Sequence, residues 1–135
     1  MRHRLSMTHT LTQAGSNAIV GYYTLAAASI PFERVPEALR ERARMSRYPA
    51  LSATLIAPLA RHEVWRGSGI GELLLVDALR RAWDQTASVG AAFVIVDAIN
   101  EAAADFYRRY SFIPFEDDDR TLFLPMIEVA RLFAR

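Results

Sequence analysis

The 135 residues are enough for one domain with its own hydrophobic core, so we expect a single domain over residues 1–135. The net charge of +1 creates no overall field that would favour nucleic acid or a membrane, and the absence of cysteine excludes disulfides, a thiol nucleophile and cysteine-ligated metals. The histidines at positions 3, 9 and 62 lack metal-ligand spacing, so no metal is expected. An N-terminus without an apolar signal core, and no apolar run of roughly 18–20 residues, predict a cytoplasmic protein outside the membrane.

The first part of the chain predicts a β-hairpin followed by a helix. A turn cluster at residues 14–17 separates two expected strands, residues 8–13 and 18–30. Pro36 occupies a favoured first-turn position for a helix over residues 37–45. Four arginines lie on that helix or just after it: Arg40, Arg42, Arg44 and Arg47.

The apolar run over residues 51–60 predicts the central strand. Pro58 interrupts it and cannot donate to a sheet ladder, so we expect a β-bulge at this point. Such a bulge would separate the strand from its neighbour and leave backbone groups unpaired for a ligand.

The second half of the chain alternates helices and strands. Apolar residues at helical spacing predict a helix over residues 72–87, with Asp77 and Arg81 among the residues of its solvent face. A buried strand is expected over residues 91–99, followed by a helix with Asn100 as its N-cap. Residues 111–115 and 121–127 predict a closing antiparallel pair. The order of elements indicates an α/β fold, a mixed sheet with one parallel crossover at its centre.

Residues 66–71, with the sequence Arg-Gly-Ser-Gly-Ile-Gly, join the central strand to the next helix. Alternating glycines allow a tight turn whose N–H groups face one spot, and the helix adds the positive end of its dipole. Arg66 supplies a guanidinium that suits phosphate oxygens. The turn therefore predicts a phosphorylated ligand, although a purely structural turn has the same composition. A Walker loop is excluded because the chain has no lysine, and the dinucleotide fingerprint fits in neither glycine frame.

The pattern that does fit is Arg-x-x-Gly-x-Gly, which resembles the pyrophosphate loop of the GNAT superfamily of acyl-CoA-dependent N-acetyltransferases. A second segment, residues 100–112, resembles the GNAT helix that follows an asparagine and ends Phe/Leu-Tyr-x-x-x-Gly-Phe. Asn100, Phe106, Tyr107 and Phe112 match this pattern, and Ser111 replaces the usual glycine. The resemblance covers residues 51–112 and implies the GNAT fold, a mixed, mostly antiparallel sheet with a central splayed parallel pair, flanked by helices.

The resemblance implies acetyl-CoA as the acyl donor and assigns its contacts. The pantetheine arm would pair with the central strand and hydrogen-bond Asn100. A backbone N–H of that strand would be the oxyanion donor. The pyrophosphate would lie on the glycine turn. The implied binding residues are Leu59, Ala60, Arg61, Arg66, Gly67, Ser68, Gly69, Ile70, Gly71 and Asn100.

The same resemblance makes Tyr107 the general acid for the leaving thiolate. A phenol with the ordinary pKa of about 10 can donate a proton to a thiolate. Without the resemblance, Tyr107 would be an aromatic side chain that packs on the sheet. The general base stays open among His62, Glu63, Asp97 and a chain of waters.

Three further segments resemble the GNAT-type toxins of bacterial toxin–antitoxin pairs: residues 20–25, the arginine-rich helix before Arg47, and residues 121–126. This implies acetylation of the amino group of aminoacyl-tRNA, which blocks translation, and an antitoxin as partner. The four arginines would contact tRNA phosphates, although a solvated helix face produces the same pattern. Compared with such toxins, the chain has a short segment before Val20.

Other functions and partners stay open. The chain could acetylate a small amine or a protein amino group, or it could be a non-catalytic CoA-binding relic. The family also implies a homodimer, for which the apolar residues 126–133 would offer a contact surface.

Overall fold

The structure is a computed structural model that describes residues 6–12, 14–15, 17–35, 50–61, 67, 69–89 and 91–133. In chain order the elements are β1 Ser6–Thr12, β2 Ile19–Pro31, the 3-10 helix η1 Phe32–Arg34, β3 Ala50–Arg61, α2 Ile70–Val89, β4 Phe93–Asp97, α3 Glu101–Arg109, β5 Ile113–Phe115, β6 Asp118–Pro125 and α4 Met126–Phe133. The helix predicted over residues 37–45, with Arg40, Arg42, Arg44 and Arg47, lies outside the described residues. The same holds for His62, Glu63, Arg66 and Ser68.

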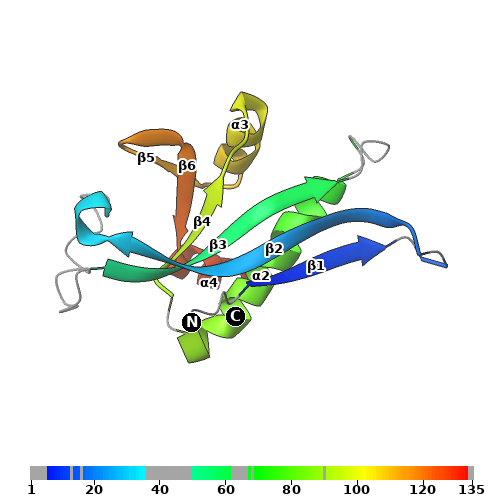
Figure 1. Cartoon of the computed structure of the whole chain (residues 1–135), viewed down its shortest axis with the longest axis horizontal. Helices are drawn as coiled ribbons and strands as arrows, with labels where there is room; N and C mark the ends of the chain where they lie inside the picture. Colours follow the sequence, from blue (N-terminus) through cyan, green and yellow to red (C-terminus); the bar gives the residue numbers. More distant parts are fainter. Residues whose placement is uncertain are drawn as a thin grey trace, which may run out of the picture.

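The six strands form one sheet in the order β1-β2-β3-β4-β6-β5. Of the described strand pairs, β3 and β4 are parallel and the others are antiparallel. Because α2 connects the two parallel strands, the chain makes the crossover that a parallel pair requires. This confirms the predicted mixed sheet with a parallel pair at its centre. Figure 1 shows that β3 and β4 diverge as they run toward their C-terminal ends.

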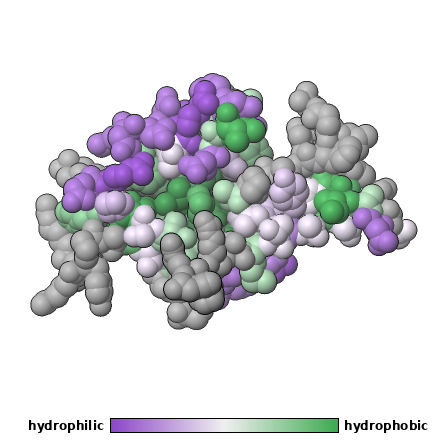
Figure 2. Space-filling model, in the orientation of Figure 1, coloured by the Kyte–Doolittle hydropathy of each residue, from purple (hydrophilic) through white to green (hydrophobic). Residues whose placement is uncertain are grey.

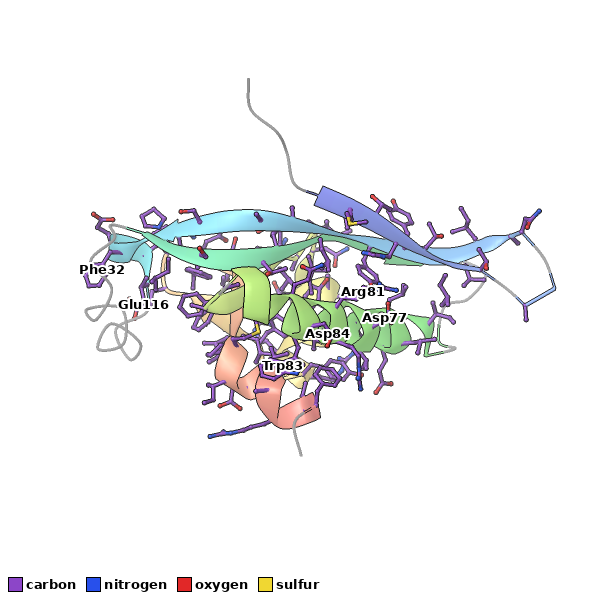
Figure 3. All side chains as sticks on the ribbon, turned by 90° about the horizontal axis from the view of Figure 1, so that it is seen from below. Phe32, Asp77, Arg81, Trp83, Asp84 and Glu116 are labelled. Carbon is purple, nitrogen blue, oxygen red and sulfur yellow. The ribbon has the colours of Figure 1, made fainter. Side chains whose placement is uncertain are left out.

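Two hydrophobic cores cover the two faces of the sheet. Successive residues of β4 alternate between them: Val94 and Val96 pack with α2, α3 and α4, whereas Phe93 and Ile95 pack in a smaller core. Figure 3 shows α2 directly beneath the strands, with α4 on the far side of α2. Figure 2 shows the opposite face, where apolar side chains gather over the middle of the sheet and hydrophilic ones cover α3.

Two element boundaries differ from the predictions. The strand predicted over residues 121–127 ends at Pro125, and the residues after it form α4. Met126 and Val129 of this helix are buried at helical spacing, and a short apolar run fits a strand or a helix equally well by sequence. In addition, α2 starts at Ile70, inside the glycine turn, rather than at residue 72.

Candidate active site

The parallel pairing of β3 with β4 is shorter than β3 itself. Registered partners run from Ala53 with Phe93 to Ile56 with Val96, whereas β3 continues to Arg61. Among the described strands, β3 therefore has no ladder partner on this side beyond Ile56. Backbone N–H and C=O groups along such an open edge can pair with an extended ligand as an added strand would. The open edge contains the predicted pantetheine-binding residues Leu59, Ala60 and Arg61.

On its other side, β3 has a bulge at the predicted position. Tyr23 of β2 pairs with Leu59 and Leu25 pairs with Ile56, so Thr24 alone faces Ala57 and Pro58. Proline is tolerated there because a bulge does not need its missing N–H. A bulge also bends its strand and increases the local twist. The predicted bulge is confirmed, and it lies where the parallel pairing ends.

The glycine turn has the backbone conformation that its composition predicts. Gly67 and Gly69 have φ angles of 77° and 87°, in the left-handed region that glycine adopts without strain. The Gly69 carbonyl accepts the first helical hydrogen bond, from the Leu73 amide, at 3.0 Å. The N–H groups of the first turn of α2 have no partner within the helix and carry the positive end of its dipole. This end of α2 can therefore bind an anion such as a pyrophosphate.

Asn100 caps α3 as predicted. Its Oδ1 accepts a hydrogen bond from the Ala103 amide at 2.9 Å. The cap uses the amide oxygen, so the Nδ2 donors can serve a ligand. The capping role and the proposed contact with pantetheine are thus compatible.

Tyr107 lies near the end of α3 with only 5% of its surface exposed. Its ring contacts Phe106 and Phe112, with centroids 5.4 and 5.5 Å away. It shares the larger core with Ile56 and Val96, the last registered pair of β3 and β4. Burial, and then the Asp97 carboxylate, raise the pKa of the phenol to about 12. The ordinary pKa assumed from the sequence is therefore corrected upward, so the phenol is protonated at neutral pH and is a weaker acid than the resemblance implied.

The turn after α3 holds Tyr107 in place. Ser111, which stands where the GNAT pattern has glycine, has a φ angle of 75°. The Phe112 amide donates to the Tyr107 carbonyl at 3.2 Å, and the Ser111 amide donates to the Arg108 carbonyl at 3.0 Å. These are the bonds of a Schellman cap. The turn therefore keeps its left-handed residue in spite of the serine.

The two sequence motifs meet in space at the start of α2. A Cβ added to Gly71 would lie 3.7 Å from the Phe106 ring. Tyr110 at the C-cap of α3 and Glu72 of α2 also lie close to each other, since burial and then the Glu72 carboxylate raise the pKa of the Tyr110 phenol. The structure thus brings together the described part of the glycine turn, the helix of Tyr107 and the core beside the open edge of β3.

Asp97 is the one candidate base that lies in the described part of the chain. It is an exposed residue at the end of β4, and its Oδ1 accepts from the Thr121 hydroxyl at 3.1 Å. The carboxylate is close enough to Tyr107 to raise the pKa of the phenol. Its position at the end of the parallel pair keeps it a candidate.

Sequence reasoning missed a polar cluster between β2 and α2. The Tyr23 hydroxyl donates to Asp77 Oδ2, and Arg81 Nε donates to the Tyr23 hydroxyl at 2.8 Å. Asp77 and Arg81 are exposed, as predicted for the solvent face of α2, and their polar ends also reach the Tyr23 hydroxyl at the edge of that face. The four-residue spacing of Asp77 and Arg81 is a signal that could have indicated their mutual ion pair, but nothing in the local sequence pointed to Tyr23.

None of the described helices is long and apolar enough to cross a membrane. The described residues also contain no group of three histidines, aspartates or glutamates that could hold a metal ion.

No protein-family model matches the chain. Among curated proteins, it is 29% identical over 114 residues to the tRNA-acetylating toxin of Mycobacterium tuberculosis, covering 84% of this chain and 66% of that protein. It is 25% identical over 131 residues to a protein described as probable toxin TacT of Sinorhizobium fredii, covering 92% of this chain and 71% of the relative. The chain thus spans about two thirds of the length of these relatives.

The solved structures that this chain resembles are also toxins and toxin–antitoxin complexes. AtaT complexed with acetyl-methionyl-tRNA superposes with a TM-score of 0.83 at 25% identity, over 94% of this chain and 75% of AtaT. The toxin–antitoxin complex AtaTR bound with acetyl-CoA matches with a TM-score of 0.76 at 28% identity, over 94% of this chain and 74% of the matched chain. This chain therefore has the GNAT fold and is similar, over most of its length, to the GNAT-type toxins of bacterial toxin–antitoxin systems.

Proposed function

We propose that residues 1–135 form one GNAT domain, an acetyl-CoA-dependent N-acetyltransferase of the cytoplasm that acetylates the amino group of aminoacyl-tRNA. The observation that carries this proposal is the open edge of β3 beyond Ile56, flanked by Tyr107 and by the N-terminal turn of α2. Similarity to a tRNA-acetylating toxin and to AtaT with acetyl-methionyl-tRNA supports the choice of acceptor. An antitoxin partner follows from the likeness to AtaTR, and a homodimer is part of the same proposal.

The donor binds along two elements. The amide groups of its pantetheine arm pair with the backbone of Leu59, Ala60 and Arg61, as an added strand pairs with an edge. Asn100 contributes an amide donor to the same arm. The pyrophosphate lies on the N–H groups at the start of α2, in a turn made by Arg66, Gly67, Ser68, Gly69, Ile70 and Gly71.

Acetyl transfer then needs three groups. The acceptor amine attacks the thioester carbonyl, and a backbone N–H of the β3 edge donates to the developing oxyanion. When the carbon–sulfur bond breaks, the Tyr107 hydroxyl donates its proton to the leaving thiolate. In the scheme that we propose, the amine loses a proton to Asp97 or to a chain of waters. Arg40, Arg42, Arg44 and Arg47 contribute salt-dependent contacts with tRNA phosphates.

The test is a transfer assay with purified protein, acetyl-CoA and methionyl-tRNA, in which acetyl-methionine is measured after release from the tRNA. We expect acetylated methionyl-tRNA and one free CoA thiol for each acetyl group transferred. Spermidine serves as the small-amine alternative. Acetylation of spermidine with untouched methionyl-tRNA would overturn the acceptor, and acetyl-CoA binding without transfer to either would leave a CoA-binding protein rather than an enzyme.

A further inference from the structure

Tyr23 forms a closed set of hydrogen bonds between the sheet and α2. The residue is 1% exposed, its hydroxyl donates to Asp77, and Arg81 Nε donates to that hydroxyl at 2.8 Å and to Asp77 Oδ2 at 3.2 Å. Figure 3 shows Asp77 and Arg81 on α2, beneath the strands of the sheet. Nothing in the proposed transfer reaction uses these three side chains, which we name the Tyr23 cluster.

The backbone of Tyr23 lies at the point where β3 becomes available to a ligand. Tyr23 pairs with Leu59, the first residue after the bulge at Ala57 and Pro58. Leu59 is also the first residue of the stretch proposed to pair with pantetheine. The position of Tyr23 therefore determines the position of one half of the CoA site.

The side chain of Tyr23 holds the element that carries the other half. Asp77 lies about two helical turns along α2 from Ile70, where the helix begins. Because a helix of this length behaves as a rod, a bond to Asp77 limits how far the first turn of α2 can slide along the sheet. That first turn is the proposed pyrophosphate site.

The charged groups of the Tyr23 cluster favour one defined hydrogen-bond geometry, which an apolar contact would not require. Burial acts to raise the pKa of Asp77, but hydrogen bonds from Tyr23 and Arg81 outweigh it and lower the pKa, so the carboxylate is ionised at neutral pH. Charge-assisted hydrogen bonds are directional and short. They add a directional restraint on the position of α2 against the sheet to the apolar packing around them.

We propose that Tyr23, with Asp77 and Arg81, is a positioning residue that sets the spacing between the open edge of β3 and the first turn of α2, so that both bind one CoA molecule at once. This role rests on the proposed function. It concerns the chain's affinity for the donor and does not place Tyr23 in contact with the reacting atoms.

The test compares whole CoA with its two parts in the variant Tyr23→Phe. Calorimetry measures the dissociation constants of CoA, of pantetheine as a probe of the β3 edge, and of ADP as a probe of the glycine turn. We expect CoA affinity to fall on the order of tenfold while the two fragments keep their wild-type affinities, because only the linked ligand needs the correct spacing. In turnover, the KM for acetyl-CoA rises and kcat at saturation changes little.

Tyr22→Phe is the matched control. Tyr22 is the neighbouring residue of β2, is 38% exposed and points to the other face of the strand. Removing its hydroxyl should leave all three affinities unchanged. If Tyr23→Phe does not fold, Arg81→Gln removes the two hydrogen bonds that Arg81 Nε donates within the cluster, and the same loss of affinity for CoA alone is expected.

Three results would overturn the positioning role. They are unchanged CoA affinity in folded Tyr23→Phe, equal weakening of CoA and of both fragments, and an equal effect in Tyr22→Phe. A wild-type protein that binds neither CoA nor ADP would instead overturn the proposed function itself, and this role with it.

Discussion

Two tyrosines of the larger core, Tyr23 and Tyr107, have similar burial and opposite surroundings. They are 1% and 5% exposed, and burial is the largest cause that raises the pKa of each phenol. The Tyr23 hydroxyl hydrogen-bonds a carboxylate and a guanidinium, whereas the causes of the raised pKa of Tyr107 are burial and the Asp97 charge, with no hydrogen bond among them. A buried hydroxyl with its partners built in holds elements together, and one without them is suited to a substrate atom. We therefore propose a positioning role for Tyr23 and a chemical role for Tyr107.

The largest expected effect is on turnover in Tyr107→Phe. Loss of a general acid should lower kcat at least about 100-fold, while the dissociation constant of acetyl-CoA stays within about threefold of the wild-type value. The free energy of unfolding should change by less than about 0.5 kcal/mol, because the ring keeps its packing against Phe106 and Phe112. Steady-state assays measure kcat, calorimetry measures the dissociation constant of acetyl-CoA, and urea denaturation measures the free energy of unfolding. A stable, fully active variant would remove the chemical role of Tyr107.

The same substitution at Tyr23 should lower the free energy of unfolding, which Tyr107→Phe leaves nearly unchanged. Tyr23→Phe breaks hydrogen bonds to two charged groups, so the free energy of unfolding should fall by about 2 kcal/mol. Urea denaturation monitored by circular dichroism measures it, with Tyr22→Phe as the control. Equal stability of Tyr23→Phe and wild type would contradict the comparison between the two tyrosines.

A smaller effect is expected at the turn that supports Tyr107. Ser111 has a left-handed backbone at a φ angle of 75°, so Ser111→Gly should raise the free energy of unfolding by about 1 kcal/mol. Ser111→Ala keeps the strain and should gain nothing. Thermal denaturation distinguishes the two variants. A loss of stability in Ser111→Gly would mean that the serine side chain contributes more than the backbone strain costs.

The smallest effect concerns His9, whose ring packs on Tyr23 at a centroid distance of 5.2 Å. Burial, and then the Arg81 charge, lower the pKa of His9 below its ordinary value, while Asp77 opposes them. The unfolded chain therefore binds a proton more readily than the folded protein, and stability should decline as the pH falls below the ordinary value of 6.5. His9→Leu should show a shallower decline between pH 7.5 and about 5.5. Denaturation midpoints across this range measure the slope, and identical slopes would exclude His9.

Much of the candidate site followed from local rules. Gly67 and Gly69 predicted a tight turn, Asn100 predicted a helix cap, and Pro58 predicted a bulge, and each is confirmed. These residues act through their own backbone or through neighbours a few positions away, so their effect can be read from the order of the amino acids. The contacts proposed for CoA and tRNA stay predictions until a ligand is bound.

What the tertiary structure decided involves partners far apart in the chain. Asp77 and Tyr23 are 54 positions apart, and no periodicity of α2 distinguishes a polar residue at the edge of its solvent face from one that reaches the sheet. The raised pKa of Tyr107 likewise depends on how deeply α3 packs and on Asp97 of another strand. The amino-acid order by itself determined the strands, the glycine turn and the helix cap, because these are local preferences. The surroundings of the Tyr23 and Tyr107 hydroxyls were decided only when the helices packed on the sheet, because burial and charge pairing are properties of the assembled core.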